Sequence, residues 1–292
     1  MQANTQMEPQ QNRLTNCWPI MLGLLILYVP TYIGLANTLW QAPENGHGPI
    51  ILIAALWLIS QRWKVLAHSP STGAVLAASL LLAFGLLLYV LGRSQDIIMF
   101  EVGSQIPVLF ACVWLLSGSR AVKALWFPIL FLIFLVPLPG FVIDSLTFPL
   151  KQMVSSVVDN ILYAAGYPIG RSGVMLTVGH YQLLVADACS GLNSMYSLSA
   201  MGLLYVYLRE RRGWLVDGLL LASILPIAFV ANIIRVIALV LITYYFGDEA
   251  GQGFMHDFAA IAEFMIAMLA LFATDYLLGL IIISKIRRHA HR

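Results

Sequence analysis

The chain has 292 residues, of which 60% are hydrophobic and 10% are charged, and its formal net charge is +2. Soluble domains contain about 25% charged residues, so this composition, with a mean hydropathy of +0.84, excludes an ordinary soluble protein. The sequence also has no glycine-rich phosphate loop, HExxH motif or basic–aromatic patch, and we therefore expect no cofactor, metal or nucleic-acid partner. The expected fold class is an all-α polytopic membrane protein.

Eight apolar stretches are candidates for helices that cross the bilayer, which takes about 20 apolar residues per helix. In chain order they cover about 18–40, 49–61, 73–92, 97–117, 124–143, 190–208, 214–236 and 257–284. The second stretch is short. Residues 237–256, which follow the seventh, are predicted to be irregular.

The basic residues predict the orientation of these spans. With the N-terminus inside, 12 of the 16 Lys and Arg residues fall on one side: Arg13, Arg62, Lys64, Arg120, Lys123, Arg209, Arg211, Arg212, Lys285, Arg287, Arg288 and Arg292. The positive-inside rule then places both termini in the cytoplasm, as expected of a multi-pass protein of the plasma (inner) membrane.

The longest segment outside the spans, residues 144–188, is expected to form a small extracytoplasmic cap. Apolar residues recur at helical spacing through 145–169, which predicts an amphipathic helix on the membrane surface. Residues 173–187 predict two short strands around Val178-Gly179-His180-Tyr181. The whole chain, 1–292, is expected to be one domain with cytoplasmic tails at 1–16 and 285–292.

This orientation brings three reactive residues to the outer face. Cys189 lies at the mouth of the sixth span, Arg235 near the top of the seventh and His256 at the top of the eighth. A thiol at a helix N-terminus is favoured as thiolate, imidazole carries protons near neutral pH, and guanidinium binds oxyanions. Together they supply the groups that acyl transfer needs, although Cys189 alone is equally well explained as a buried thiol.

Four neighbouring residues are candidates for support of this site: Asp187, Ser190, Asn232 and Asp257. Asp187 and Ser190 are expected to cap the helix that follows Cys189. Asn232 lies one helical turn before Arg235, and Asp257 either caps the last span or tunes the imidazole of His256.

Three further acids, Glu101, Glu263 and Asp275, fall inside predicted spans. A carboxylate within the membrane marks either a functional site or a hydrogen bond to a neighbouring helix. The sequence leaves both readings open.

The segments 187-DACSGLNSMYSL-198, 232-NIIR-235 and 256-HD-257, in this order at the tops of successive spans, resemble the exosortase/archaeosortase family. The segment 46-GHGPIILIAALWL-58 is similar to an early segment of exosortases. The length of the chain is similar to a short bacterial form, the exosortase B subtype.

This resemblance implies a cysteine endopeptidase or transpeptidase with Cys189 as nucleophile, Arg235 as transition-state stabiliser and His256 as general acid/base. The implied partners are membrane lipids and exported proteins that end in a Pro-Glu-Pro sorting motif, a transmembrane helix and a basic tail, in a setting of exopolysaccharide production. The implied acceptor of the acyl group is either water or an amine on a glycan or lipid.

Two alternatives remain open. A transporter or channel for glycan or lipid precursors would use Glu101, Glu263, Asp275 and Arg235 as polar sites within the membrane. A rhomboid-like serine protease would use Ser190-Gly191, but Ala188 occupies the position of the first glycine in its GxSG motif.

Overall fold

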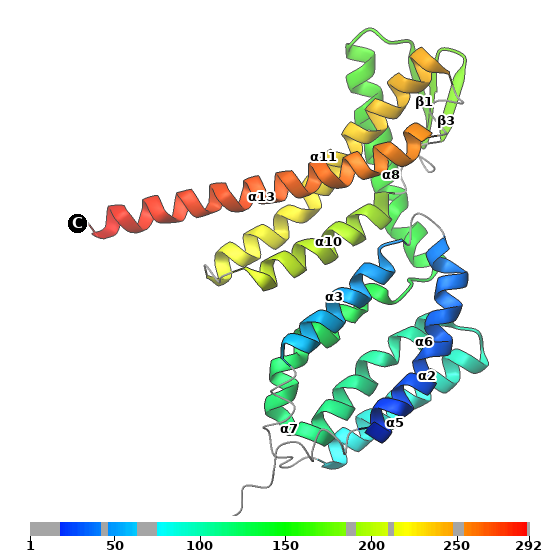
Figure 1. Cartoon of the computed structure of the whole chain (residues 1–292). Helices are drawn as coiled ribbons and strands as arrows, with labels where there is room; N and C mark the ends of the chain where they lie inside the picture. The colour runs from blue at the N-terminus through cyan, green and yellow to red at the C-terminus, as the bar shows by residue number, and fades with distance from the viewer. Residues whose placement is uncertain are drawn as a thin grey trace, which may run out of the picture. The chain divides into compact units, whose positions relative to one another are not determined.

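The structure is a computed structural model that describes residues 18–41, 46–62, 75–184, 191–209, 213–247 and 254–290. At residues 143, 144, 146, 191–195, 254–257, 260 and 281–290 it describes the backbone alone. The chain divides into two compact units, residues 1–139 and 140–292, which are drawn in Figure 1.

The first unit is helical throughout its described part. Its elements are α2 (Trp18–Asn37), η1 (Leu39–Gln41), α3 (Gly48–Gln61), α5 (Val75–Ser94), α6 (Ile98–Gly103), α7 (Gln105–Phe131) and η3 (Leu132–Leu135). The helices α2 and α5 confirm the first and third predicted spans to within a few residues, and α3 matches the bounds of the second but has only 14 residues.

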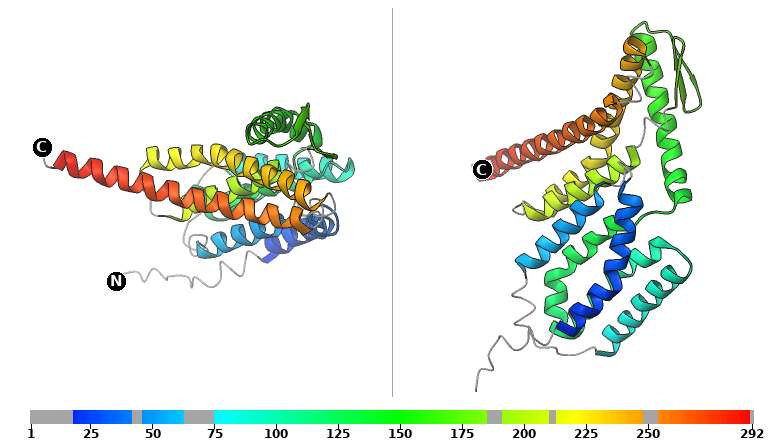
Figure 2. Two further views of the ribbon diagram at one scale, coloured as in Figure 1. Left: turned by 90° about the horizontal axis from the view of Figure 1, so that it is seen from above. Right: turned by 45° about the vertical axis from the view of Figure 1, so that its right-hand side comes forward.

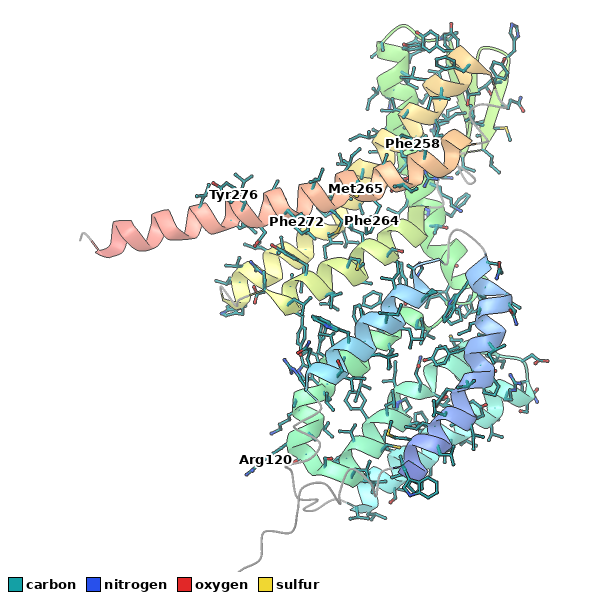
Figure 3. All side chains as sticks on the ribbon, in the orientation of Figure 1. Arg120, Phe258, Phe264, Met265, Phe272 and Tyr276 are labelled. Carbon is teal, nitrogen blue, oxygen red and sulfur yellow. The ribbon has the colours of Figure 1, made fainter. Side chains whose placement is uncertain are left out.

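The continuous apolar stretch Ile98–Leu135 covers the fourth predicted span and the first part of the fifth. Gly118 interrupts α7 with φ 73° and ψ −175°, a conformation that glycine adopts without the clash that a Cβ would cause. The break therefore lies where the sequence predicts a connection, just before Arg120, which Figure 3 labels.

The predicted end of the fifth span, at residue 143, is wrong. The helical stretch ends at Leu135, Val136 is extended with ψ 116°, and α8 begins at Gly140. Pro137 and Pro139 explain the difference, because proline lacks an N–H donor and disfavours helical backbone at the preceding residue.

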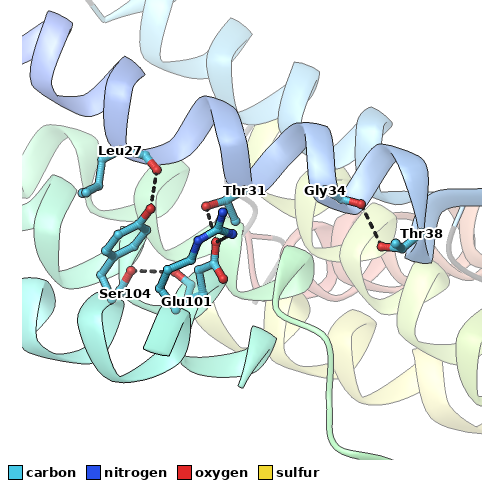
Figure 4. A network of polar contacts seen from close by, with 8 residues as sticks. Leu27, Thr31, Gly34, Thr38, Glu101 and Ser104 are labelled. Atoms are coloured by element: carbon cyan, nitrogen blue, oxygen red, sulfur yellow. Dashed lines mark hydrogen bonds and ion pairs between the residues drawn. The ribbon is translucent and has the colours of Figure 1, made fainter. Parts of the chain in front are cut away.

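A buried polar network ties α2 to α5 and α6. The Thr31 hydroxyl donates to Glu101 Oε1 at 2.6 Å, and Arg93 Nη1 reaches the same oxygen at 3.1 Å. Tyr28 Oη and Ser104 Oγ lie 2.9 Å apart beside them. Figure 4 shows Thr31, Glu101 and Ser104 of this network. Glu101 thus takes a charged partner and a hydroxyl partner from two neighbouring helices, which agrees with the helix-bonding reading of this carboxylate.

The second unit combines long helices with a small sheet. Its elements are α8 (Gly140–Ala164), β1 (Ile169–Ser172), β2 (Met175–Val178), β3 (Tyr181–Leu184), α10 (Gly191–Leu208), α11 (Trp214–Phe246) and α13 (Phe254–Ala290). Helices α10, α11 and α13 pack along one another, as the views in Figures 1 and 2 agree.

The predicted amphipathic helix and hairpin are both present. Strands β2 and β3 are joined by Gly179 and His180, with Gly179 at φ 57°. The sequence did not predict β1, which pairs antiparallel with β2 to give the order β1-β2-β3.

The apolar face of α8 packs differently from the prediction. A single core joins α8, the sheet and α11, and its members include Val154, Val158, Leu162, Leu176, Val178, Leu183, Val236, Leu239 and Val240. Much of the face that was expected to rest on lipid therefore rests on protein.

Helix α11 is longer than predicted. It continues without a break to Phe246 and ends at Gly247, where φ is 88°. The prediction of an irregular segment over 237–256 is therefore wrong for 237–246, an apolar run that contains no glycine or proline. Residues 248–253 of that segment lie outside the described residues. The added turns carry α11 past the bilayer-length stretch and into the core beneath the sheet.

An ionic clasp joins α10, α11 and α13 at the other end of the unit. Arg209, directly after α10, pairs with Asp217 of α11 at 2.5 Å and with Asp275 of α13. Asp275 also accepts from the Tyr205 hydroxyl at 2.8 Å, and the Tyr205 ring packs edge-on against Phe272, which Figure 3 labels. We call the contacts among Arg209, Asp217 and Asp275 the clasp.

Among the described residues, five stretches are long and apolar enough to cross a membrane: Trp18–Asn37, Val75–Ser94, Ile98–Leu135, Trp214–Phe246 and Ile261–Leu280. The apolar helices Gly48–Gln61 and Tyr196–Leu208 are shorter. The predicted class, an all-α polytopic membrane protein, is confirmed.

The clasp predicts a stability defect. Replacing Asp275 by Asn removes one charge that faces Arg209, and we expect the free energy of unfolding to fall by about 1.5–3 kcal/mol, the range for a hydrogen bond to a charged group. Asp217→Asn should cost less, because the Asp217 side chain is 22% exposed and that of Asp275 is 6% exposed. Thermal unfolding of the purified variants in detergent measures both effects, and an unchanged Asp275→Asn protein would show that the clasp does not stabilise the unit.

Candidate functional site

The predicted nucleophile, Cys189, lies outside the described residues, together with Asp187 and Ser190. Its place in the chain is defined by its neighbours: β3 ends at Leu184 and α10 begins at Gly191. The roles of these three residues stay predictions.

Arg235 lies in the interior of α11 and is 3% exposed. Asn232, one helical turn earlier, is 6% exposed and shares its face of the helix. From Arg235, α11 continues for 11 residues, or about 16 Å, to Phe246, and Leu239 and Val240 on this part of the helix pack into the core with the sheet. Arg235 is therefore buried between helices and does not reach out to an aqueous surface as a snorkelling arginine would.

The partner of Arg235 is Glu263 of α13. Arg235 Nη1 and Glu263 Oε2 are 3.1 Å apart, and the two side chains are 1% and 3% exposed. Sequence reasoning singled out both residues but did not pair them. The signal was available, because a guanidinium and a carboxylate in neighbouring apolar spans are both costly unless each finds an opposite charge.

His256 belongs to the first turn of α13, where the structure describes the backbone alone. It precedes Glu263 by seven residues, so the helical period places both positions on one face, about 10 Å apart along the axis. Asp257 follows in the same turn on a different face. The Arg235 guanidinium lies against Glu263, two turns along α13 from position 256.

The clasp gives these helices a common reference point. Gly191 lies 18 residues before Arg209, Arg235 lies 18 residues after Asp217, and His256 lies 19 residues before Asp275. At 1.5 Å per residue, each is about 27–29 Å from the clasp along its own helix. The backbone positions at the start of α10, in α11 and at the start of α13 thus lie at similar heights in the three-helix bundle.

Packing between the clasp and this level keeps the three helices together. One apolar cluster contains Leu198 of α10, Leu220, Ile224, Ala228 and Ala231 of α11, and Ala267 and Leu271 of α13. In addition, Gly202 of α10 lies so close to Ile224 that an added Cβ would be 2.6 Å from its Cδ1. Close contact along the helices limits how far their upper ends can separate.

The chemistry available near Arg235 and Glu263 is ionic and hydrogen-bonding. The described residues contain no group of three His, Cys, Asp or Glu side chains suited to hold a metal ion. The guanidinium of Arg235 has five N–H donors in a fixed plane. One of them, on Nη1, donates a hydrogen bond to Glu263 Oε2. Such a group can stabilise negative charge that develops on a substrate.

Comparison with known families gives one match. Residues 39–273 match the family model for transmembrane exosortase (Exosortase_EpsH), a range that contains Cys189, Arg235, His256 and Glu263. Neither the curated proteins nor the solved structures that were searched gave a match. The match does not separate subtypes, so the subtype stays a prediction. The chain belongs to the transmembrane exosortase family.

Proposed function

We propose that the protein is a membrane cysteine peptidase or transpeptidase that cleaves C-terminal sorting signals of exported proteins. One observation carries the proposal: Gly191, Arg235 and position 256 lie at similar distances from the clasp on three helices that pack together. Cys189 precedes Gly191 by two residues. Membership of the exosortase family supports the same conclusion.

In the proposed reaction, the Cys189 thiolate attacks the scissile carbonyl carbon and forms a tetrahedral oxyanion. Arg235 stabilises that oxyanion, because its planar fork of donors is suited to oxygen anions. The C–N bond then breaks, His256 gives a proton to the leaving amine, and a thioester remains on Cys189. Attack by an acceptor on the thioester carbonyl releases the product and regenerates the thiol.

Asp187, Ser190, Asn232 and Asp257 support these groups in the proposal. Of these four residues, Asn232 has the best structural support, since it is buried one turn from Arg235 on α11. Asp187 and Ser190, which lie on either side of Cys189 in the sequence, would cap α10.

The proposed substrate has a Pro-Glu-Pro motif, an apolar helix and a basic tail at its C-terminus. Its helix would cross the membrane beside the enzyme, with the basic tail in the cytoplasm and the motif at the outer face. This geometry requires the active site to face away from the cytoplasm. Twenty residues of substrate helix span about 30 Å, close to the distance of about 27 Å between the clasp and Arg235 along α11. The acceptor is water or an amine on a glycan or lipid.

The burial of Arg235 sets a requirement on this reaction. With a side chain that is 1% exposed, the guanidinium is screened from bulk water, which strengthens its interaction with an oxyanion. The substrate carbonyl must therefore enter between the helices to reach it.

A transporter would need polar groups within the membrane that are open to its cargo. The three acids that this alternative invokes each have an arginine as partner: Glu101 pairs with Arg93, Glu263 with Arg235 and Asp275 with Arg209. These contacts join helices within each unit, and they favour a structural or positioning role over cargo binding.

The nucleophile is tested by Cys189→Ala. Co-expressed with a matched substrate that carries its own sorting signal, this variant should leave the substrate at full length, because no other group forms the thioester. Cys112→Ala is the matched control, since Cys112 is a half-buried thiol of α7 with no role in the proposal. Immunoblots of the substrate measure both, and processing by Cys189→Ala at the wild-type rate would refute the cysteine mechanism.

The oxyanion role is tested by Arg235→Lys. Lysine retains a positive charge for Glu263 and thus the ion pair, but it lacks the planar fork. We expect kcat to fall by about 10²–10³-fold, the usual loss for one oxyanion donor. Arg93→Lys changes the equivalent residue of the Arg93–Glu101 pair and should alter kcat by less than about threefold. Equal rates for the two variants would remove Arg235 from the mechanism.

A further inference from the structure

Glu263 has no role in the reaction as proposed so far, yet it forms an ion pair with Arg235. Its side chain is 3% exposed, and its Oε2 lies 3.1 Å from Arg235 Nη1. It occupies α13 seven residues from His256, on the same face of the helix. One face of α13 therefore carries both the predicted proton carrier and the residue that binds the predicted oxyanion stabiliser.

The directions of the two helices explain how this pair forms. Arg235 lies 18 residues from the clasp on α11, and Glu263 lies 12 residues from it on α13, a difference of about 9 Å in height. Side chains lean toward the N-terminus of their own helix. Since α11 and α13 run in opposite directions, the arginine leans toward the clasp and the glutamate leans away from it, and the two groups meet.

This contact limits the freedom of the guanidinium. An arginine side chain has several rotatable bonds, and ordering it costs about 2 kcal/mol of side-chain entropy at most. A buried carboxylate on Nη1 fixes one edge of the planar group, which leaves its remaining edges in a defined plane. An oxyanion stabiliser works best when it is already oriented before charge develops.

Stability alone is a weak explanation of the pair. Apolar side chains of similar volume often stabilise a protein as well as a buried ion pair does, because the desolvation of two charges offsets their attraction. Most neighbours of the pair on α11 and α13 are apolar, with Ala231, Val236 and Ala267 all buried, and Asn232 is the buried polar neighbour on α11. If the reaction requires the positive charge of Arg235, the presence of the negatively charged Glu263 beside it is explained.

We propose that Glu263 is a positioning residue of the reaction, which holds the Arg235 guanidinium in the orientation that stabilises the oxyanion. This inference rests on the proposed function. Glu263 acts through Arg235 and does not itself contact the substrate. Helix α13 then contributes two functions from one face, the proton carrier in its first turn and the support of Arg235 two turns later.

The variant Glu263→Gln tests the inference. Glutamine keeps the size of the side chain and a carbonyl acceptor for Nη1, but it removes the charge. We expect kcat for cleavage of a purified substrate with its sorting signal to fall by about 10–100-fold, because misplacement of a group by about 1 Å costs up to 100-fold. KM should change by less than about threefold, since the proposal gives Glu263 no contact with the substrate.

Glu101→Gln is the matched control. It makes the same change at another buried acid that lies 3.1 Å from an arginine, Arg93, and Glu101 has no part in the proposed reaction. This control should lower thermal stability while kcat stays within about threefold of the wild-type value. A similar loss of kcat in both variants would mean that Glu263 is merely structural, and would overturn the inference.

A double variant separates action through Arg235 from independent action. If Glu263 works only by orienting the guanidinium, Arg235→Lys with Glu263→Gln should be as slow as Arg235→Lys alone. Losses that multiply would overturn the inference, as would a Glu263→Gln enzyme with an unchanged or raised kcat. Should Glu263→Gln fail to fold, Glu263→Asp retains the charge on a side chain one methylene shorter and should still lower kcat without raising KM.

The two proposals fail in different ways. Normal cleavage by Cys189→Ala would contradict the proposed function whatever Glu263 does. Loss of cleavage in Cys189→Ala and Arg235→Lys, together with a fully active Glu263→Gln, would contradict only the positioning role.

Discussion

Charge matching between neighbouring helices is the constraint on which the rest of the structure depends. Three acids lie buried in apolar helices, and each contacts an arginine: Glu101 with Arg93, Asp275 with Arg209, and Glu263 with Arg235. A lone charge in a low-dielectric interior is costly, so each pair restricts which helices can be neighbours and at what height. The apolar surfaces alone would permit many helix arrangements, because apolar contacts have no direction.

The clasp and the Arg235–Glu263 pair divide this task in the second unit. The clasp sets the relative heights of α10, α11 and α13 at one end of the bundle. The Arg235–Glu263 pair joins α11 to α13 at a second point, about two-thirds of the length of α11 from its N-terminus. Because helices have a constant rise, a contact at one end also determines which residues are level at the other. The consequence for function is that the start of α10, Arg235 and the start of α13 lie at similar heights in one bundle.

Hydropathy predicted most of the helices, and local rules predicted some of the breaks. The connection between the fourth and fifth spans, where Gly118 takes a positive φ, coincided with the break in hydropathy. The end of the fifth span and the length of α11 were predicted wrongly for opposite reasons. Pro137 and Pro139 stop an apolar run early, whereas the apolar run 237–246 continues as helix because the sheet and α8 cover it.

The candidate site was predictable as a set of residues but not as a set of contacts. Arg235, Asn232 and Glu263 were each conspicuous as polar residues in apolar spans. Their pairing was not predictable, because a sequence shows which helices carry charge but not which helices pack together. The strand β1, with the sequence Ile-Gly-Arg-Ser, was missed because it has no alternating apolar pattern. Its extended conformation depends on its pairing with β2 and not on its own residues.

The account centres on a thioester at Cys189, and mass spectrometry tests it most directly. Full-length enzyme in detergent is mixed with a substrate that carries its sorting signal, quenched in acid within seconds and digested. The account predicts that the peptide containing Cys189 carries the N-terminal fragment of the substrate through a bond that hydroxylamine cleaves. Cleavage of the substrate with no such adduct on Cys189, or with the adduct on another residue, would contradict it.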